Sequence, residues 1–292
     1  MWHMQAESPL LLYGVSKEVV EFPGYWPSNI HVCGFWFLPS EWQFSCNKCR
    51  EMMSPSPDSS VSERKTMCAA HVDMQQFLMK SSNPCLPLFI GLSSIGSMGF
   101  LKNPHAFLRV LEAVLEITEY SFVLFSAGYE PLDAAIQSLA GASPSRSNPE
   151  AQSVGGTLLF NNRIYCFSGS VPYSWLFPRC AVAIHHGGSG STAAALHAGI
   201  PQIVCPFILD QFYWAERLHW IGVAPEPLQS RHLLPDNDAT SINQAADSLV
   251  RTIKVALSPE IKSQALKVAN RISSEDGLQE ALKVLKEKLL IS

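Results

Sequence analysis

The sequence predicts an α/β protein: a parallel, Rossmann-like sheet with helices on both faces. From Pro84 onward, short apolar runs alternate with longer runs of helical periodicity, which is the pattern of strands joined by crossover helices. Of the 292 residues, 47% are apolar, so the chain can bury a core of one large or two modest domains. Each element can be placed from local signals.

The predicted strands end in small or polar residues and are followed by helical segments. They are LPLFIGL (86–92), SFVLFSAG (121–128), RIYCFSG (163–169), VAIHH (182–186) and PQIVCPF (201–207). We expect helices from Pro104, near 131–139, from about 191 and from about 211. Asn103 is a side-chain acceptor directly before Pro104, which predicts the first helix start. Gly199, followed by Pro201, predicts the end of the helix that begins near 191.

The chain divides unevenly. Residues 1–44 are rich in aromatic residues and proline, and HVCGFWF (31–37) is their one clear strand. Residues 45–83 contain SPSPDSSVSER, which predicts a mobile polar insertion or linker. Residues 84–292 form the α/β domain and include a polar surface loop at 141–157 and a last helix. That helix carries a leucine stripe at positions 278, 282, 285 and 289, behind the acidic pair Glu275 and Asp276.

Composition argues against several partners and locations. The formal net charge is −4 and the basic residues are scattered, which disfavours a nucleic-acid surface or an anionic membrane surface. The sequence shows no signal peptide and no apolar run of bilayer length, so we expect a cytoplasmic chain without a transmembrane segment. Eight cysteines in a chain of this size indicate reduced, buried thiols rather than a disulfide framework.

The glycine-rich turn at 187–192 is the strongest functional signal. It follows the VAIHH strand, and ligands of open parallel sheets gather at the carboxyl ends of strands. Gly187, Gly188 and Gly190 allow a ligand to approach the backbone, while Ser191 and Thr192 bring hydroxyls to a helix N-terminus that favours an anion. The alternative is a tight strand-to-helix turn that binds nothing. Adjacent strand residues point to opposite faces, and we place His186, nearer the turn, against a phosphate.

Two common nucleotide sites do not fit these letters. A dinucleotide fingerprint requires G-x-G-x-x-G, and GLSSIGSMG at the first strand is spaced differently. A Walker loop requires a lysine before the serine, where Gly190 stands. Downstream, Asp210 and Gln211 offer acceptors and donors suited to sugar hydroxyls, although Asp210 could equally cap the next helix. The ligand that these residues still favour is a nucleotide diphosphate linked to a sugar.

The segment from Ser170 to Leu228, with AIHHGGSGSTAAALHAG and CPFILDQFYWAERL, resembles the donor-binding signature of UDP-dependent glycosyltransferases of GT-B architecture. Within them it is most similar to sterol 3-β-glucosyltransferases, and IGLSSIGSMGF, FSAGYEP and YGVSKEVVEFPGYWP extend the likeness over nearly the whole chain. The resemblance implies that residues 84–292 are the UDP-sugar-binding domain. It also implies that residues 1–44 are a remnant of the acceptor domain and of the connection between domains.

The resemblance also implies roles for single residues. His186 matches the histidine that contacts the diphosphate, and the turn with Gly188, Ser191 and Thr192 matches the phosphate-binding turn. Asp210 and Gln211 match the pair that holds the hexose. Ser93 and Ser94 match the loop that approaches the donor from the side. Val171 and Pro172 match the segment that recognises uracil. Many plant members open that last motif with a tryptophan stacked on the base, where this chain has Ser170; for Trp175 we expect a packing role.

The implied reaction transfers glucose from UDP-glucose to a hydroxyl of a sterol-like lipid with inversion, without a required cofactor. The catalytic base is expected in the family's N-terminal domain. We expect that domain to be missing from this chain, and neither His3 nor His105 is a candidate for the base. The chain is therefore expected to be a truncated form that binds UDP-glucose and transfers it poorly. The alternatives are a silent UDP-sugar-binding partner of a full-length enzyme and an enzyme for another hydrophobic aglycone. Peripheral membrane contact through the lipid acceptor is compatible with the full-length form.

One further pattern lies in the polar insertion. Cys46, Cys49, Cys68 and His71 form C-x2-C-x18-C-x2-H, a spacing that suits a structural zinc ion. The alternative is chance spacing, which the sequence favours because the intervening residues lack the small hydrophobic core of an ordinary zinc module.

Overall fold

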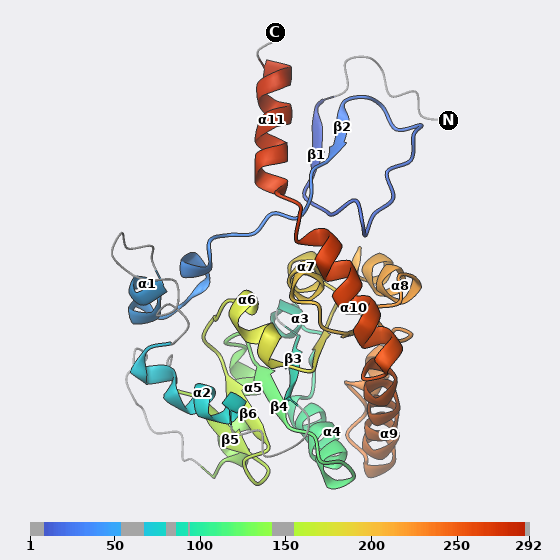
Figure 1. The fold of residues 1–292 in the computed structure, drawn as a ribbon. Helices are drawn as coiled ribbons and strands as arrows, with labels where there is room; N and C mark the ends of the chain where they lie inside the picture. The colour runs from blue at the N-terminus through green and yellow to red at the C-terminus, as the bar shows by residue number, and fades with distance from the viewer. Residues whose placement is uncertain (1–8, 54–66, 80–85, 93, 142–154, 290–292) are drawn as a thin grey trace.

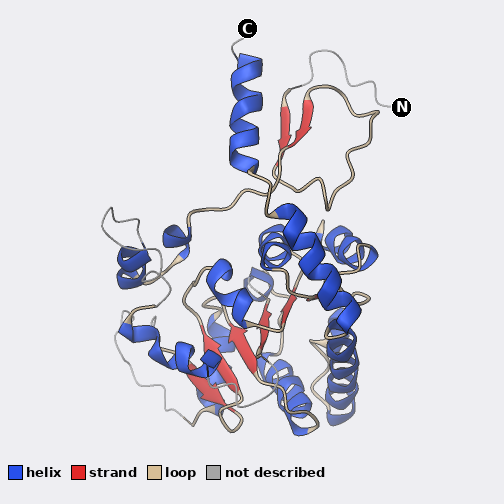
Figure 2. Ribbon diagram, in the orientation of Figure 1, coloured by secondary structure: helices blue, strands red, loops and turns tan. Residues whose placement is uncertain are grey.

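The computed structural model describes residues 9–53, 67–79, 86–92, 94–141 and 155–289. Its centre is a six-stranded sheet in the order β5-β6-β4-β3-β7-β8. The strands are β3 (Leu88–Gly91), β4 (Phe122–Phe125), β5 (Thr157–Leu159), β6 (Ile164–Phe167), β7 (Val182–His185) and β8 (Gln202–Val204). All neighbours pair in parallel except β5, which runs antiparallel to β6 at the edge. The predicted Rossmann-like parallel sheet is confirmed (Figure 2).

Helices cover both faces of this sheet, and the strand residues alternate between two cores. Leu88, Ile90 and Leu124 point into a core shared with helices α4, α5 and α9. Phe89 and Val123, one position along, point into a second core shared with α2, α6 and the following 3-10 turn. The helices named here are α2 (Val72–Met79), α4 (Pro104–Glu116), α5 (Glu130–Leu139), α6 (Tyr173–Leu176) and α9 (Ala239–Ala256). Burial on both faces explains why these strands are continuously apolar.

A third core joins the C-terminal half to the N-terminal segment. Helices α7 (Ser189–Ala198), α8 (Gln211–Trp220) and α10 (Pro259–Ile272) pack together around Trp214 and Leu218, and Val19 and Phe35 contribute to the same cluster. Residues of the first 44 are therefore part of the folded unit. A short helix, α3 (Ser94–Ser97), follows β3 at the other side of the site described below.

The helix ends confirm the local predictions. The Asn103 side chain accepts a hydrogen bond from the Ala106 N–H at 3.0 Å, which caps α4 one residue before Pro104. Gly199 ends α7 with φ of +70°, a left-handed conformation that favours glycine. At the last helix, α11 (Gly277–Leu289), the Asp276 carboxylate accepts from the Gln279 N–H at 3.0 Å.

The N-terminal segment and α11 lie together at one end of the molecule, away from the main sheet (Figure 1). The segment forms a two-stranded parallel sheet of β1 (Leu11–Tyr13) and β2 (Ile30–Val32), so the strand predicted at 31–37 is shorter and begins one residue earlier. The Trp36 indole donates to the Gly277 carbonyl at 3.1 Å, which joins the two chain regions. On α11, Leu278 and Leu282 are half-exposed, at 50% and 46%.

Two parts of the chain are more ordered than the sequence predicted. The loop expected at 141–157 ends in β5, whose pairing with β6 was missed because three residues give no periodic signal. The flanks of the expected mobile insertion form α1 (Asn47–Met53), a 3-10 turn (Ala69–His71) and α2, and their apolar side chains enter the second core. The polar run SPSPDSSVSER lies outside the described residues. The predicted domain boundaries stay predictions.

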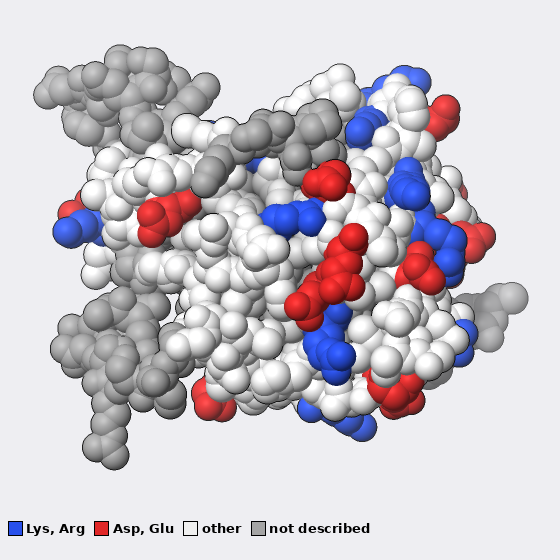
Figure 3. All heavy atoms as spheres, turned by 90° about the horizontal axis from the view of Figure 1, so that it is seen from below, with Lys and Arg blue, Asp and Glu red and all other residues white. Residues whose placement is uncertain are grey.

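The surface charges, the helices and the cysteines of the described residues can be compared with what the sequence predicted. On the face drawn in Figure 3, acidic and basic side chains are interspersed. No helix in the described part of the chain combines the length and the apolarity that crossing a bilayer demands. The seven described cysteines are free thiols, and six of them are buried, which confirms the prediction of reduced, buried thiols for these residues.

Candidate functional site

The strand order has a switch point between β3 and β7. From β3 the chain adds β4 and β6 on one side and then β7 and β8 on the other, so the order reverses at the β3–β7 pair. Loops that leave these two carboxyl ends diverge and open a place for a ligand. Ser94 follows β3 and His186 follows β7, on the two sides of this switch point. Ser93 lies outside the described residues.

The two adjacent histidines have different environments. His185 is the last residue of β7 and is fully buried. Its Nδ1 accepts from the Gly187 N–H at 3.0 Å, so the ring proton is on Nε2, which donates to Gln202 Oε1 at 2.8 Å. Burial lowers the pKa of His185 to about 4, and it is therefore neutral at ordinary pH. His185 is a structural residue that holds the start of the turn.

His186, like His185, lies against the turn, and its predicted contact with a phosphate stays a prediction. It is 7% exposed and its Nδ1 is buried without a hydrogen-bond partner. Its Nε2 lies against Gly188, where an added Cβ would overlap that nitrogen and lie 3.1 Å from Cε1. Burial lowers the pKa of His186, while the nearby Asp210 carboxylate acts in the opposite direction. The imidazole is thus held neutral beside the amino end of α7.

That amino end presents free donors and hydroxyls. The first helical hydrogen bond runs from the Thr192 N–H to the Gly188 carbonyl at 3.0 Å, so the N–H groups of the residues between them have no helical acceptor. Gly188 has no side chain to cap them. Ser191 and Thr192 are buried, and Thr192 Oγ1 has no hydrogen-bond partner. Dipole and free N–H groups together favour a bound anion here.

Of the glycines in the turn, Gly187 is required by its backbone conformation and by close packing. Gly187 has φ of +86°, and a Cβ there would lie 2.8 Å from Val204 Cγ1 and 3.1 Å from the Gln211 carbonyl oxygen. The turn after β7 therefore packs directly on the start of α8, which brings the two predicted parts of the site together. Around Gly190 an added Cβ would meet no atom within 4 Å, so this position borders open space.

Asp210 and Gln211 occupy the tip of the β8–α8 turn. Asp210 makes no cap bond to α8; its Oδ2 accepts from the Trp214 indole at 3.0 Å instead. The Gln211 side chain is buried, and its Oε1 accepts from the Phe207 N–H at 2.9 Å and the Ile208 N–H at 3.2 Å. The amide nitrogen of Gln211 and the second oxygen of Asp210 are left for a ligand. Leu209 precedes them with φ of +52°, a conformation that is strained for leucine.

The segment predicted to read a base is anchored from outside the sheet. Val171 and Pro172 are buried, and the Ser170 carbonyl accepts from the Ser45 N–H at 3.0 Å. Trp175 is 8% exposed, with the Arg179 guanidinium 4.4 Å above its ring centre. Trp175 packs in the second core, in agreement with its predicted role.

Sequence reasoning missed three supporting residues: Gln202, Trp214 and Ser45. Each acts through a hydrogen bond to a residue of the site or its neighbour, and no spacing in the sequence signals such a contact. It also gave no indication of a cleft of about 850 Å³ beside the site, lined by residues from the β8–α8 loop, α8 and the segment that follows. The predicted site residues do not line this cleft. Phe207, whose N–H is held by Gln211, does.

Comparison with known proteins identifies the region. Residues 160–286, which include β7, the turn and α8, match the family model of the erythromycin biosynthesis protein CIII-like C-terminal domain. This stretch, less than half of the chain, is thus similar to the EryCIII-like C-terminal domain. Each residue placed above at the turn after β7 and at the start of α8 falls inside it.

Relatives extend the likeness beyond the EryCIII-like domain. The sterol 3-beta-glucosyltransferase UGT80B1 of Arabidopsis thaliana is 38% identical over 111 residues, which are 38% of this chain and 16% of the relative. A sterol 3-beta-glucosyltransferase of Debaryomyces hansenii is 32% identical over 278 residues, which are 94% of this chain and 14% of the relative. The chain thus spans about one sixth or less of these curated relatives. Among solved structures, glycosyltransferase VinC in complex with DTDP aligns with 72% of this chain and 43% of its own, at 20% identity and a TM-score of 0.47.

Proposed function

We propose that this chain binds UDP-glucose at the amino end of α7 and supplies the donor half of a glucosyltransferase that acts on a sterol-like lipid. The observation that carries the proposal is a pair of buried polar atoms without partners, His186 Nδ1 and Thr192 Oγ1, at a helix N-terminus on the switch point of the sheet. Buried polar groups are rarely left unpaired, so two such atoms at one helix N-terminus call for an explanation, and a bound ligand would supply it. The names of the relatives support the donor class and the sterol-like acceptor.

The proposed roles follow from the placement of each group. The neutral His186 ring lies beside Gly188 with its Nδ1 unpartnered, and an N–H at Nδ1, together with the free N–H groups of α7, would stabilise the diphosphate. Asp210 and the Gln211 amide would hold the hexose, and Val171 and Pro172 would border the base. Ser94, exposed at the start of α3, would approach the donor from the other side.

The proposed reaction is a direct displacement at the anomeric carbon with inversion. Negative charge develops on the departing UDP, and the amino end of α7 is oriented to stabilise it without a proton transfer to the diphosphate. The acceptor hydroxyl must lose its proton to a general base. We assign no described residue to that step.

Calorimetry with UDP and UDP-glucose tests the donor site. We expect both to bind, and we expect Asp210→Asn to weaken UDP-glucose while it leaves UDP within about twofold, because Asp210 is assigned to the hexose. His105→Ala, an exposed change on α4, is the matched control and should alter neither. Absence of binding by the wild-type chain would refute the proposal.

A turnover assay with UDP-glucose and a sterol separates the remaining possibilities. Binding with transfer to the sterol supports the glucosyltransferase. Binding without transfer to any acceptor supports a silent UDP-sugar-binding protein, and transfer to another apolar alcohol in preference to the sterol supports a different aglycone.

A further inference from the structure

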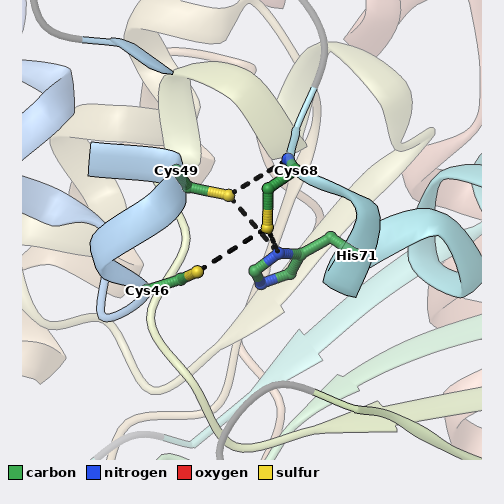
Figure 4. A group of neighbouring side chains, drawn as sticks. All are labelled: Cys46, Cys49, Cys68 and His71. Atoms are coloured by element: carbon green, nitrogen blue, oxygen red, sulfur yellow. Dashed lines mark hydrogen bonds between the residues drawn. The ribbon is translucent and has the colours of Figure 1, made fainter. Parts of the chain in front are cut away.

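Outside the candidate site, four side chains of the insertion converge on one point. Cys46, Cys49, Cys68 and His71 each offer one ligand atom, and these four atoms all lie within 4.8 Å of one another. Figure 4 shows the three sulfur atoms and the imidazole turned toward a common centre. We propose that this cluster is a structural zinc site that fixes the insertion to the sheet and supports the loop of the nucleotide-binding site at Ser170.

The distances are those of ligands that share a metal. The Sγ atoms of Cys46 and Cys68 are 3.7 Å apart, and the Sγ atoms of Cys49 and Cys68 lie 3.4 Å and 3.5 Å from His71 Nδ1. Zinc binds sulfur at about 2.3 Å and nitrogen at about 2.0–2.1 Å, so a tetrahedral ion sets S···S near about 3.8 Å and S···N near about 3.6 Å. A disulfide would require about 2.05 Å.

The backbone around the cluster is built as two short turns. Cys46 and Cys49 flank the start of α1, where the Arg50 N–H donates to the Cys46 carbonyl at 3.0 Å. Cys68 and His71 flank the 3-10 turn, where the His71 N–H donates to the Cys68 carbonyl at 2.9 Å. The Cys68 N–H also donates to Cys49 Sγ at 3.4 Å, which orients that sulfur as an outer-shell partner of a metal ligand does. Ligands 22 positions apart in sequence are thus preset in space.

The ligand set selects the metal and its role. Three thiolates and one imidazole, with no oxygen ligand, suit zinc and disfavour magnesium or calcium. Four protein ligands fill a tetrahedral shell and leave no open position, which is typical of structural sites. Three of the four residues are buried, so substrate has little access.

The insertion can fold without a hydrophobic core of its own. Met67, Met74 and Leu78 are buried in the second core together with Phe89 and Tyr165 of the main sheet. The apolar side chains of the insertion thus pack in the core of the domain. The sequence favoured chance spacing because the insertion lacks a hydrophobic core of its own, and this packing removes that objection.

The metal would couple to the proposed nucleotide site through one short connection. Ser45, next to Cys46, donates its N–H and its hydroxyl to the Ser170 carbonyl, at 3.0 Å and 3.3 Å. Ser170 precedes Val171 and Pro172, which are assigned to the base. This coupling rests on the proposed function, whereas the zinc site itself does not.

Metal analysis of the full chain, purified without added chelator, tests the site. We expect close to one zinc ion per chain, X-ray absorption with three sulfur ligands and one nitrogen ligand, and a tetrahedral cobalt spectrum after exchange. Cys49→Ser and His71→Ala should lose most of the zinc. His71→Cys should retain it with four sulfur ligands, and Cys33→Ser, a buried thiol outside the cluster, should retain it unchanged.

Zinc far below one equivalent in the wild-type chain, or equal zinc content in Cys49→Ser and Cys33→Ser, would overturn the proposal. Retention of zinc by the His71→Cys variant would show that zinc loss in His71→Ala comes from a missing ligand and not from general misfolding. A thiol can replace a histidine that binds the metal, but it could not preserve zinc binding if the histidine served only to maintain the fold. Failure of UDP to bind to zinc-loaded protein would overturn the proposed function and leave the zinc site standing.

Discussion

Gly188→Ala gives the sharpest test of the phosphate-binding turn. Gly188 has φ of −62° and ψ of 141°, which alanine adopts without strain, so the change acts through its new Cβ alone. That Cβ would overlap His186 Nε2 and must displace the ring, which is only 7% exposed and has little room to move. The substitution therefore removes the proposed histidine contact with the diphosphate and leaves His186 itself in place.

The magnitude follows from the contact that is lost. A hydrogen bond to a charged group contributes about 1.5–3 kcal/mol. At about 1.4 kcal/mol per factor of ten, UDP should bind about 10- to 150-fold more weakly. The overpacked turn should also lower the free energy of unfolding by about 1–3 kcal/mol.

Calorimetry with UDP on folded protein, with circular dichroism to verify the fold, measures both effects. Gly155→Ala is the matched control, because its Cβ meets no atom within 4 Å and its φ lies outside the left-handed range. It should bind UDP as the wild type does. If Gly188→Ala binds UDP within twofold of the control, His186 does not contact the diphosphate and the reasoning fails.

Three further outcomes are expected. Burial lowers the pKa of His186, and a bound diphosphate would raise it. The affinity for UDP-glucose should therefore increase as the pH falls toward the pKa of His186 in the free protein, by at most about tenfold per pH unit. The His186→Gln variant should lose this pH dependence. Burial lowers the pKa of His185 from 6.5 to about 4, so between these pH values the folded state binds fewer protons than the unfolded state. The free energy of unfolding, measured by urea titration, should therefore fall by up to about 3 kcal/mol as the pH drops through this range. Trp214→Phe releases the Asp210 carboxylate, so UDP-glucose should bind about 2- to 12-fold more weakly while UDP is unaffected.

Each outcome has a clear contrary result. A pH dependence that persists in the His186→Gln variant would assign it to another group. Stability that stays constant between pH 6.5 and about 4 would mean that His185 does not bury a neutral ring against Gln202. Equal losses for UDP and UDP-glucose in Trp214→Phe would place Asp210 away from the hexose.

Much of the site could be predicted because its signals are local. A run of apolar residues that ends in glycine and serine specifies a strand, a turn and a helix N-terminus by itself. Strand alternation does not separate the two histidines, because His185 accepts from the Gly187 N–H and His186 lies against Gly188. The position of the Gln211 side chain was beyond such reasoning: its Oε1 accepts from the Phe207 and Ile208 N–H groups, and that depends on how the β8–α8 turn closes.

The sequence alone determined the parallel sheet, the capped helices and the position of the glycine-rich turn, since periodicity, Asn103 and Gly199 act over a few residues. The tertiary structure alone decided what lies beside that turn. It added β5 at the edge, brought Gly187 against Gln211, and gathered cysteines and a histidine from both ends of a polar insertion. Such contacts depend on the three-dimensional path of the chain, because residues far apart in sequence meet only once the apolar faces have packed.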